Sequence, residues 1–217
     1  MKTALIFGSS GLVGKNLLNQ ILNNSNYSKI KIFVRSSLEI SDQKVEIINT
    51  DFKDLQKIKN LIIGDDCFFC IGTTKKNSPD KNEYRRVELD LPKKIAQISK
   101  SNDIKSFIYV SSGFADPKNS GDYLKFKGLV EEEIKSLNFE KIGILRPSFL
   151  LGKRKEKRLG EKIGISIFKF LSPLFVGPIK KMKPIHSEKV AKAMIQIANE
   201  NIQQIIFESN EISDLVR

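Results

Sequence analysis

Short apolar runs alternate with amphipathic helical patterns along this chain. Runs of strand length stand at residues 4–7, 29–34, 45–49, 67–71, 106–110, 141–145 and 205–207. Apolar residues recur at helical spacing in residues 12–22, 92–98, 123–136 and 190–198, with Pro92 close to the start of its helix. Such an alternation is typical of a parallel sheet covered by helices on both faces. The pattern therefore predicts an α/β fold with a doubly wound parallel sheet.

The length of the chain fits one such domain. Its 217 residues, of which 40% are hydrophobic, are enough to bury a core. The pattern becomes less regular after the strand at 141–145, and residues 151–184 predict a small substrate lobe. We therefore expect a single domain over residues 1–217 that carries this lobe near its C-terminal end.

A glycine-rich turn directly follows the first predicted strand. It consists of Gly8, Ser9, Ser10, Gly11, Leu12, Val13 and Gly14. Gly8 would permit a tight turn, Gly11 the approach of a pyrophosphate, and Gly14 close packing of helix on strand. The N-terminus of the helix would hold the negative charge. The turn predicts a dinucleotide site, although its glycine spacing is GxxGxxG instead of GxGxxG.

The end of the second predicted strand bears on which dinucleotide is bound. Arg35, Ser36 and Ser37 stand where an Asp or Glu would select NAD through the ribose hydroxyls. A guanidinium and two hydroxyls suit a 2′-phosphate, which favours NADP(H). The alternative is an arginine that is only solvated. Asp51 and Phe52, after the third strand, would flank the adenine ring, or Asp51 would cap a helix.

Candidate catalytic residues lie between the fifth predicted strand and the next helix. Tyr123 and Lys127 are four residues apart on one helical face, and Ser111 and Ser112 emerge from the strand end beside them. With a nicotinamide in place, Tyr123 would exchange a proton with the reacting oxygen, and Ser112 would hydrogen-bond that oxygen. Lys127 would bind ribose hydroxyls and stabilise the phenolate. Ser111 is a rival for the serine role, and the Tyr–Lys spacing also arises by chance in lysine-rich helices.

The fourth predicted strand should also meet the cofactor, through the residues that follow it. These are Gly72, Thr73 and Thr74. The same stretch contains Cys67 and Cys70, whose spacing is CxxC. Residues three apart in a buried strand point to opposite faces, so we expect two core thiols and no metal site. His186 is the only histidine, which leaves little for a zinc site or a histidine-based triad.

Together these motifs resemble the short-chain dehydrogenase/reductase superfamily and, within it, the atypical, Tat-interacting-protein-like oxidoreductases. The resemblance covers nearly the full length and is carried by residues 8–14, 35, 70–74, 110–113, 123–128, 145–152 and 186–191. It implies a Rossmann-like domain with NADP(H) and a catalytic set at Ser112, Tyr123 and Lys127. It also implies a cofactor contact near Pro147. One departure is Glu88, which stands where extended members of the superfamily usually carry an asparagine.

The charge of the chain invites a second class of interpretation. Its 37 basic and 25 acidic residues give a formal net charge of +12, which suits nucleic acid or an anionic membrane. The basic runs at 153–158 and 180–183 and the apolar pattern at 163–176 would form a surface that rests on lipid. A solvated loop and a buried lobe helix account for the same residues. We therefore expect no nucleic-acid partner and no transmembrane segment, and leave a peripheral membrane contact open.

The sequence favours an oxidoreductase that uses NADP(H) on a carbonyl or an alcohol. Apolar residues in segment 151–184 suit a hydrophobic or aromatic substrate, whereas its lysines would tolerate an anionic one. The alternative is a non-catalytic protein that binds NADP(H) as a redox sensor or regulatory subunit, and the presence of Tyr123 and Lys127 argues against it. Because Gly8 and Lys15 interrupt the first apolar run, the sequence predicts no signal peptide and a cytoplasmic protein.

Overall fold

The computed structural model describes residues 1–36, 38–152 and 181–217. The strands are β1 (Lys2–Phe7), β2 (Tyr27–Val34), β3 (Val45–Asn49), β4 (Asp66–Phe69), β5 (Ser106–Val110), β6 (Lys141–Arg146), β7 (Leu150–Leu151), β8 (Ile185–His186) and β9 (Ile206–Glu208). The helices are α1 (Leu12–Leu22), α2 (Lys81–Arg85), α3 (Leu91–Ser101), α4 (Asp122–Ser136), α6 (Ser187–Asn199) and α7 (Ser209–Leu215). Two 3₁₀ turns, η1 (Leu55–Lys57) and η2 (Lys59–Leu61), and a π-helical turn, η3 (Arg86–Asp90), complete the described elements.

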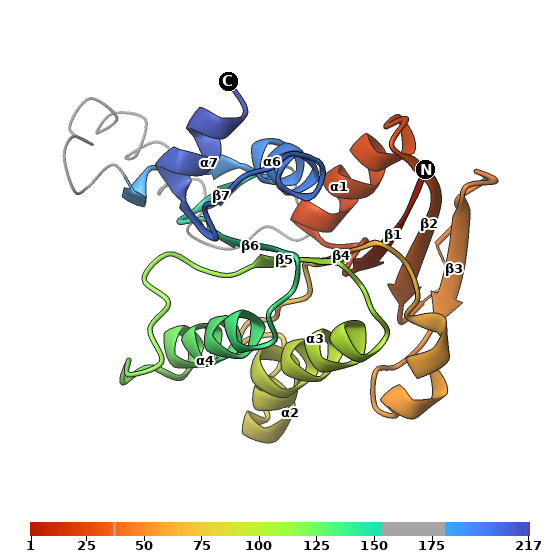
Figure 1. Cartoon of the computed structure of the whole chain (residues 1–217). Coiled ribbons are helices and arrows are strands. Elements are labelled where there is room, and N and C mark those ends of the chain that lie inside the picture. The colour runs from red at the N-terminus through yellow and green to blue at the C-terminus, as the bar shows by residue number, and fades with distance from the viewer. Residues whose placement is uncertain (37, 153–180) are drawn as a thin grey trace.

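Seven strands form one parallel sheet in the order β3-β2-β1-β4-β5-β6-β9. The chain builds outward from β1 to β3, then crosses back so that β4 lies on the other side of β1. Figure 1 shows this sheet between two layers of helices. The predicted doubly wound parallel sheet is thus confirmed. Open α/β sheets bind ligands outside the carboxyl ends of the strands where the order reverses, which here are β1 and β4.

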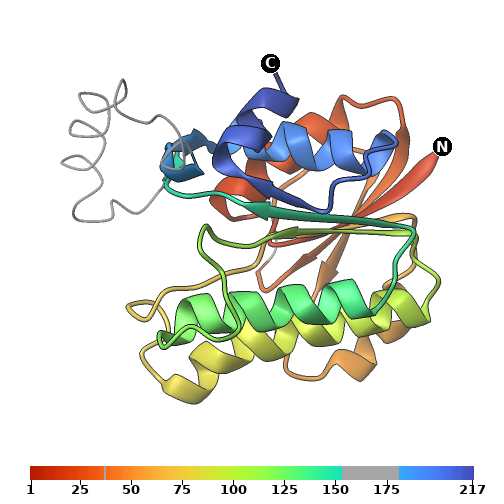
Figure 2. The same cartoon turned by 60° about the vertical axis from the view of Figure 1, so that its left-hand side comes forward.

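The two faces of the sheet bury separate hydrophobic clusters. Helices α1, α6 and α7 cover one face, and α2, α3 and α4 cover the other (Figures 1 and 2). Side chains alternate between the faces along each strand: Ala4 and Ile6 of β1 join the cluster beneath α1 and α6, whereas Leu5 and Phe7 join the opposite one. This alternation explains why the buried strands read as continuous apolar runs in the sequence.

The cluster beneath α1 and α6 joins distant parts of the chain. It combines residues 4–34 with residues 185–216, and Asn16 of α1 donates a hydrogen bond to Ser187 of α6 at 2.9 Å. The buried residues of the opposite cluster lie between Leu5 and Ile144, and Ile206 of β9 packs against it. The C-terminal elements therefore supply much of one core and only one contact residue to the other.

The helical region before β5 begins earlier than predicted. The chain is helical from Lys81, because α2 runs through η3 directly into α3. Pro92 stands in the first positions of α3, as predicted, and the π-helical turn precedes it. A proline lacks the N–H of an ordinary α-helical bond, and π turns relax the helix where such a bond is lost. Ile95 is fully buried, while Ile98 is partly buried.

The predicted strands agree with the observed ones to within a few residues. The largest difference is at β4, which ends at Phe69, so that Cys70 lies in the loop after it. Cys67 belongs to the cluster under α3, and Cys70 packs against the opposite cluster, with its sulfur 3.9 Å from that of Met194. Both cysteines are free thiols on opposite faces, as predicted.

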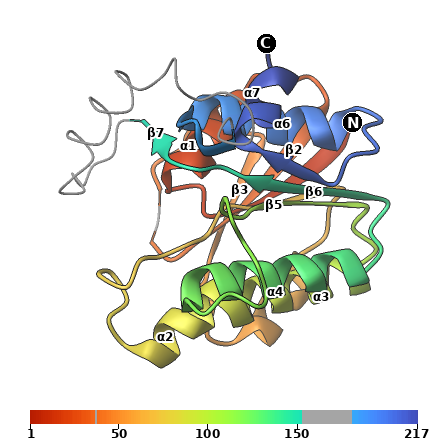
Figure 3. The same cartoon turned by 90° about the vertical axis from the view of Figure 1, so that its left-hand side faces the viewer.

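The sequence pattern did not indicate η1, η2 or α2, nor several elements after β6. Strands β7 and β8 form a separate two-stranded parallel sheet, and α7 follows β9 (Figure 3). His186 is exposed and lies at the end of β8, directly before α6. The predictions for residues 153–158 and 163–176 lie outside the described residues. Among the helices that are described, none has the length and apolarity to cross a membrane.

Candidate active site

The turn between β1 and α1 has the geometry that its glycines suggested. Gly8 adopts a φ of 91°, in the left-handed region, and its carbonyl accepts a hydrogen bond from the Gly11 N–H at 3.0 Å. A Cβ at Gly14 would lie 2.1 Å from the Gly8 carbonyl oxygen, so only glycine allows α1 to approach this closely. A Cβ at Gly11 would meet only that same oxygen, at 3.3 Å. Gly8 and Gly14 shape the backbone, whereas Gly11 leaves space open beside the turn.

The start of α1 presents unpaired donors in this turn. Gly11 is the N-cap and offers no side-chain acceptor, and no acidic residue occupies the first helical turn. Ser9 is buried, and its hydroxyl has no hydrogen-bond partner among the described residues, while Ser10 is exposed. A helix N-terminus carries a partial positive charge together with free N–H groups. This geometry fits a bound phosphate group.

Arg35 lies at the carboxyl end of β2, beside the end of β3. Arg35 is exposed. A hydrogen bond from the Thr50 N–H to the Val34 carbonyl, at 2.8 Å, joins the ends of β3 and β2. Phe52 is buried with a φ of 58°. The expectation that Asp51 caps a helix is wrong: its carboxylate accepts a hydrogen bond from the Lys53 N–H within the loop. Ser36 is exposed, and Ser37 lies outside the described residues.

A second arginine near this end of the site was missed by the sequence analysis. Arg86 donates to both carboxylate oxygens of Glu83 at 2.7 Å and to the carbonyl of Phe52 at 3.0 Å. The hydrogen bonds from Arg86 lower the pKa of Glu83, and the charges of Lys53 and Arg35 lower it further. Arg86 thus joins α2 to the loop after β3, on the side of the site where Arg35 also lies.

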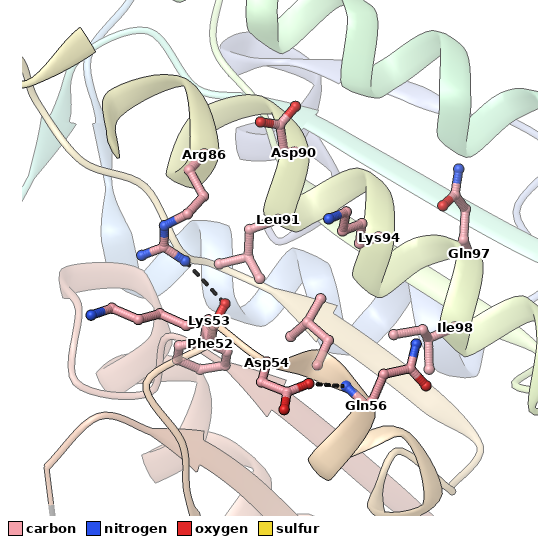
Figure 4. A pocket seen from close by; sticks show the side chains of 11 residues that line it. Phe52, Lys53, Asp54, Gln56, Arg86, Asp90, Leu91, Lys94, Gln97 and Ile98 are labelled. Carbon is pink, nitrogen blue, oxygen red and sulfur yellow. Dashed lines mark hydrogen bonds between the residues drawn. The ribbon is translucent and has the colours of Figure 1, made fainter. Parts of the chain in front are cut away.

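A pocket of about 400 Å³ opens between the loop after β3 and helix α3 (Figure 4). Phe52, Asp54, Arg86 and Lys94 are among its lining residues. It shares Phe52 with the predicted cofactor site, but none of the predicted catalytic residues lines it. Hence this pocket is separate from the candidate chemistry at the ends of β4 and β5.

The loop after β4 packs against residues from α4 and η3. A Cβ at Gly72 would lie 3.3 Å from Glu88 Oε1 and 3.9 Å from Lys127 Nζ. The Thr73 N–H donates a hydrogen bond to Glu88 Oε1, and the Thr73 hydroxyl lies 3.0 Å from that of Ser78. The Thr74 carbonyl accepts two N–H bonds that close the following turn. The loop predicted to meet the cofactor is thus adjacent to the predicted catalytic lysine.

Lys127 is buried at the centre of this arrangement. Its Nζ lies 3.1 Å from Glu88 Oε2 and donates a hydrogen bond to the Tyr109 hydroxyl at 3.0 Å. It also lies 5.9 Å from the ring centroid of Tyr123. The side chains of Lys127 and Glu88 are only 4% and 0% exposed. The structure therefore brings Tyr123 and Lys127 together as their spacing indicated, and adds Glu88 and Tyr109.

The charge state of Lys127 follows from these neighbours. Burial lowers its pKa, but the carboxylate of Glu88 and the hydroxyls of Tyr109 and Tyr123 outweigh burial and raise the pKa well above its usual value. Burial raises the pKa of Tyr109, although Lys127 opposes this rise. Lys127 is hence an ammonium and Tyr109 a neutral phenol at physiological pH.

Tyr123 and Ser112 differ from Lys127 in exposure. Tyr123 is 39% exposed at the start of α4, after the carboxyl end of β5. Ser112 is partly buried, and its hydroxyl contacts only the carbonyl of its neighbour Gly113, at 3.3 Å, among the described residues. Both hydroxyls can therefore meet a ligand without breaking a strong bond within the protein.

Ser111, by contrast, is tied into another buried network. Its hydroxyl donates to Glu131, which also accepts two hydrogen bonds from Arg146. Arg146 further pairs with Glu208 at 3.3 Å. This network fastens β5, α4, β6 and β9 together. The geometry therefore favours Ser112 over Ser111 as the serine that is available to a ligand.

Pro147 borders the same end of the sheet. Its carbonyl accepts a hydrogen bond from the Gly113 N–H at 3.0 Å, which joins the loops after β5 and β6. Phe114, which follows Gly113 in the chain, has a φ of 65° and is 47% exposed. Lys181 Nζ lies 5.2 Å from the Phe114 ring centroid. An aromatic side chain and a cation thus stand beside the predicted serine.

Sequence signals for the contacts of Lys127 with Tyr109 and Glu88 are weak. Tyr109 stands near the end of an otherwise apolar strand, and Glu88 stands among apolar helical positions, which hints that both are buried. The pairing of Glu88 with Lys127 joins two elements distant in sequence, so no local spacing could reveal it.

Comparisons with known proteins agree with this geometry. A family described as NAD(P)H-binding matches residues 8–201. Protein HTATIP2 from Rattus norvegicus is 33% identical over 171 residues, which cover 77% of this chain and 70% of that protein. The mitochondrial protein FMP52 from Debaryomyces hansenii is 30% identical over 206 residues, which cover 93% of this chain and 90% of its own length.

Solved structures share the fold at low sequence identity. The Bordetella bronchiseptica enzyme WbmH, in complex with NAD+, has a TM-score of 0.73 at 14% identity, over 96% of this chain and 75% of that one. Vestitone reductase from alfalfa (Medicago sativa) has a TM-score of 0.65 at 17% identity, over 95% and 76% of the two chains. These similarities support the Rossmann-like arrangement of the sheet.

Proposed function

The chain belongs to the NAD(P)H-binding family, as an atypical member of the short-chain dehydrogenase/reductase superfamily, and from this premise we propose that it is an NADP(H)-dependent oxidoreductase. Its substrate is a carbonyl compound or the corresponding alcohol. The observation that carries the proposal is the buried Lys127 ammonium beneath the partly exposed ring of Tyr123. A cation and a phenol in this relation, at the carboxyl end of a parallel strand, suit acid–base chemistry on a bound ligand.

The β1–α1 turn supports a pyrophosphate-binding role. The uncapped N-terminus of α1 and the unpaired hydroxyl of Ser9 supply donors, while Gly14 lets the helix approach β1 closely. Arg35 supplies a guanidinium at the end of β2 for the 2′-phosphate. Phe52, Gly72 and Pro147 would line the remaining length of NADP(H), which supplies or takes the hydride when it is bound.

The catalytic step needs three side chains of this protein. Tyr123 gives its phenolic proton to the carbonyl oxygen during reduction and takes it back during oxidation. Ser112 donates a hydrogen bond to the same oxygen. Lys127 remains charged, stabilises the phenolate and donates to a ribose hydroxyl. Since Ser111 is held by Glu131, Ser112 is the serine we assign to this step.

For the substrate, we propose a hydrophobic or aromatic compound. Phe114 and Lys181 stand beside the candidate site and would accept a planar apolar group and tolerate an anionic one. The proposed lobe at 151–184 falls mostly outside the described residues.

We also propose a cytoplasmic location for this chain. The FMP52 relatives are named as mitochondrial proteins, so a mitochondrial location is the alternative to test. Fractionation of cells that express the full chain should recover it in the cytosolic fraction. Recovery in mitochondria would contradict this proposal and leave the enzymatic one untouched.

A cofactor-consumption screen tests the enzymatic proposal. The purified chain is mixed with NADPH or NADH and with a panel of aromatic and aliphatic aldehydes and ketones, and loss of the reduced cofactor's absorbance is followed. We expect turnover with NADPH and at least one aromatic carbonyl compound. Tight NADPH binding without turnover across the panel would favour the non-catalytic redox-sensing alternative. Failure to bind either cofactor would contradict both.

A further inference from the structure

The ion pair between Glu88 and Lys127 is buried on all sides. Its members are 0% and 4% exposed and lie 3.1 Å apart, whereas most ion pairs in the described part of the chain lie at the surface. Burying a charge is costly unless a partner and further hydrogen bonds compensate for it. Each charge therefore depends on the other to offset the cost of its burial.

The two oxygens of Glu88 have separate roles. Oε1 accepts the Thr73 N–H from the loop after β4, and among the described residues Oε2 faces only Lys127. The carboxylate is thus anchored by backbone on one side and paired with the ammonium on the other. Such an anchor fixes where the ammonium stands relative to the candidate cofactor loop.

Lys127 keeps one donor free in this arrangement. An ammonium has three N–H donors, and in the described residues its oxygen partners are Glu88 and the Tyr109 hydroxyl. Its Nζ also lies 5.0 Å from the Tyr109 ring centroid and 5.9 Å from that of Tyr123. The remaining donor is available to a ligand hydroxyl at this end of the sheet.

The position of Glu88 depends on the π-helical turn. Glu88 is the central residue of η3, and it is buried there together with Leu89. Each residue added to a helix rotates the following side chains by about 100°. The extra residue in the π-helical turn therefore changes the direction in which the Glu88 side chain points relative to the side chains of α3. Single π turns of this kind are frequent at functional sites.

We propose that Glu88 is a positioning residue that holds the Lys127 ammonium charged and in place beneath Tyr123, through a carboxylate anchored on the Thr73 N–H. This inference rests on the proposed function, because it assigns Glu88 a part in preparing the same site. Glu88 touches neither substrate nor reacting atoms.

The groups that titrate around Lys127 come from every element packed against it. They are Glu88 of η3, Tyr109 of β5, Tyr123 of α4, Tyr84 of α2 and Cys70 in the loop after β4. Burial raises the pKa of Tyr84 to about 12 and also raises the pKa values of Cys70 and Tyr109, so these three groups are neutral at neutral pH and Glu88 is the carboxyl group of this set. Loss of the Glu88 charge thus removes the carboxylate that faces the ammonium in this set.

The test follows the protonation of Lys127 in the cofactor-free protein. Lysine labelled with ¹³C at Cε is titrated by NMR in the parent, Glu88→Gln and Glu88→Asp, with the Lys127 signal assigned from its loss in Lys127→Arg. We expect Lys127 of the parent to stay protonated up to the pH at which the fold is lost, and to titrate below that pH in Glu88→Gln, with an apparent pKa lower by about 1–3 units and a smaller decrease in Glu88→Asp. An unchanged titration in Glu88→Gln would overturn the proposal.

Glu131→Gln is the matched control. Glu131 is 1% exposed and stands one helical turn after Lys127 on α4, but among the described residues its carboxylate binds Ser111 and Arg146 and not Lys127. The variant therefore also removes one charge of a buried pair, and we expect it to destabilise the fold and to shift the Lys127 titration much less than Glu88→Gln does. A similar shift in both variants would mean that Glu88 has only a general structural role, and would also overturn the proposal.

If Glu88→Gln does not fold, the double variant Glu88→Gln/Lys127→Met decides. Removing both charges is far less costly than leaving one unpaired in the interior. The double variant should therefore recover folding, as measured by thermal unfolding. If the double variant is as unstable as Glu88→Gln alone, the proposed dependence of Lys127 on Glu88 is contradicted. These measurements need no turnover, so they remain valid if the protein shows no reductase activity. Conversely, a failure of the Glu88 proposal would not contradict turnover with NADPH.

Discussion

The two ends of the parallel sheet both bury polar groups, and at the amino ends a cluster around Asp66 finds its partners within the protein. At the amino ends of the strands, Asp66 accepts hydrogen bonds from Tyr27, at 2.7 Å, and from Ser106, and it pairs with Lys2 at 3.1 Å. Asn199 donates to the Tyr27 hydroxyl at 2.9 Å. This cluster is closed, and it fastens β1, β2, β4 and β5 to the end of α6.

At the carboxyl ends several polar groups are left open, beside the closed networks of Glu131 and Glu88. The Ser9 hydroxyl has no partner among the described residues, α1 begins without a side-chain cap, and the phenol of Tyr123 reaches solvent. Unsatisfied donors lower stability unless a ligand fills them. The comparison teaches that closed polar clusters hold this fold, whereas open ones mark where a ligand is expected.

Gly11→Val tests the open end most severely. A branched side chain would occupy the space beside the turn, where the pyrophosphate is expected, while the backbone at Gly11 stays in an ordinary conformation. We expect NADPH titration to show no binding and circular dichroism to show an intact fold. Gly14→Ala should instead unfold the turn, because its Cβ has no room. Retained affinity in Gly11→Val would mean that the turn is only structural.

Tyr123→Phe separates chemistry from binding at the same end. It removes only the hydroxyl, so cofactor affinity should stay nearly constant while turnover falls by about 10²–10⁴-fold. Lys127→Ala should weaken cofactor binding as well, since the ammonium is proposed to hold the ribose. Steady-state rates and titrations on both variants check this. Turnover at the parent rate in Tyr123→Phe would refute the catalytic assignment.

Arg35→Ala probes the open end at its adenosine side. Loss of a charge-assisted phosphate contact should weaken NADPH binding by about 1.5–3 kcal/mol and leave NADH binding nearly unchanged. Isothermal titration with both cofactors measures the difference. Equal affinities of the parent protein for NADH and NADPH would refute the assignment of Arg35 to the 2′-phosphate.

Asp66→Asn makes the complementary break at the closed end. An amide cannot accept all the hydrogen bonds that the buried carboxylate accepts from Tyr27 and Ser106, so the free energy of unfolding should fall by about 1–3 kcal/mol. Urea unfolding measures this loss. NADPH affinity should not change; a large loss of affinity in the folded variant would show that the two ends are coupled.

Alkaline pH should weaken the closed end selectively. Burial raises the pKa of Tyr27, and the Asp66 carboxylate raises it further. An unfolded chain loses this proton near pH 10 while the folded protein keeps it, so the stability is present below that pH and is lost as pH rises. Tyr27→Phe should cost about 0.5–1.5 kcal/mol at neutral pH and make the alkaline decline shallower. Urea unfolding at pH 8 and above pH 10 tests this; an equally steep decline in both proteins would contradict it.

Local patterns predicted the sheet well, because buried parallel strands are short apolar runs and their order follows from the βαβ connections. The glycine turn and the Tyr123–Lys127 pair are local too, and their geometry is as the spacing indicated. Strands β7 and β8 escaped prediction, since each has two residues and pairs across a long separation. The Glu88–Lys127 contact was also not predicted, because it joins two elements that are distant in sequence.

The difference between the two serines also lay beyond the sequence. Ser111 and Ser112 are adjacent and chemically identical, and only the tertiary position of Glu131 separates them. Likewise, Asp51 fits a helix cap as a residue type, but the cap of η1 is Asp54. Short polar side chains take whichever backbone donor the loop presents, so their roles depend on the loop's conformation.

The late completion of one face of the sheet has a consequence for synthesis on the ribosome. The buried residues of the cluster under α3 and α4 all lie before Phe149, and only Ile206 packs against it from later in the chain, whereas the cluster under α1 draws many buried residues from 185–216. During elongation, α1 and the outer surface of β1 and β2 therefore stay uncovered while most of the chain emerges. Exposed apolar strands of this kind are substrates for chaperones and prone to association. Nascent chains stalled shortly after β6 should thus bind chaperones until α6 has left the exit tunnel.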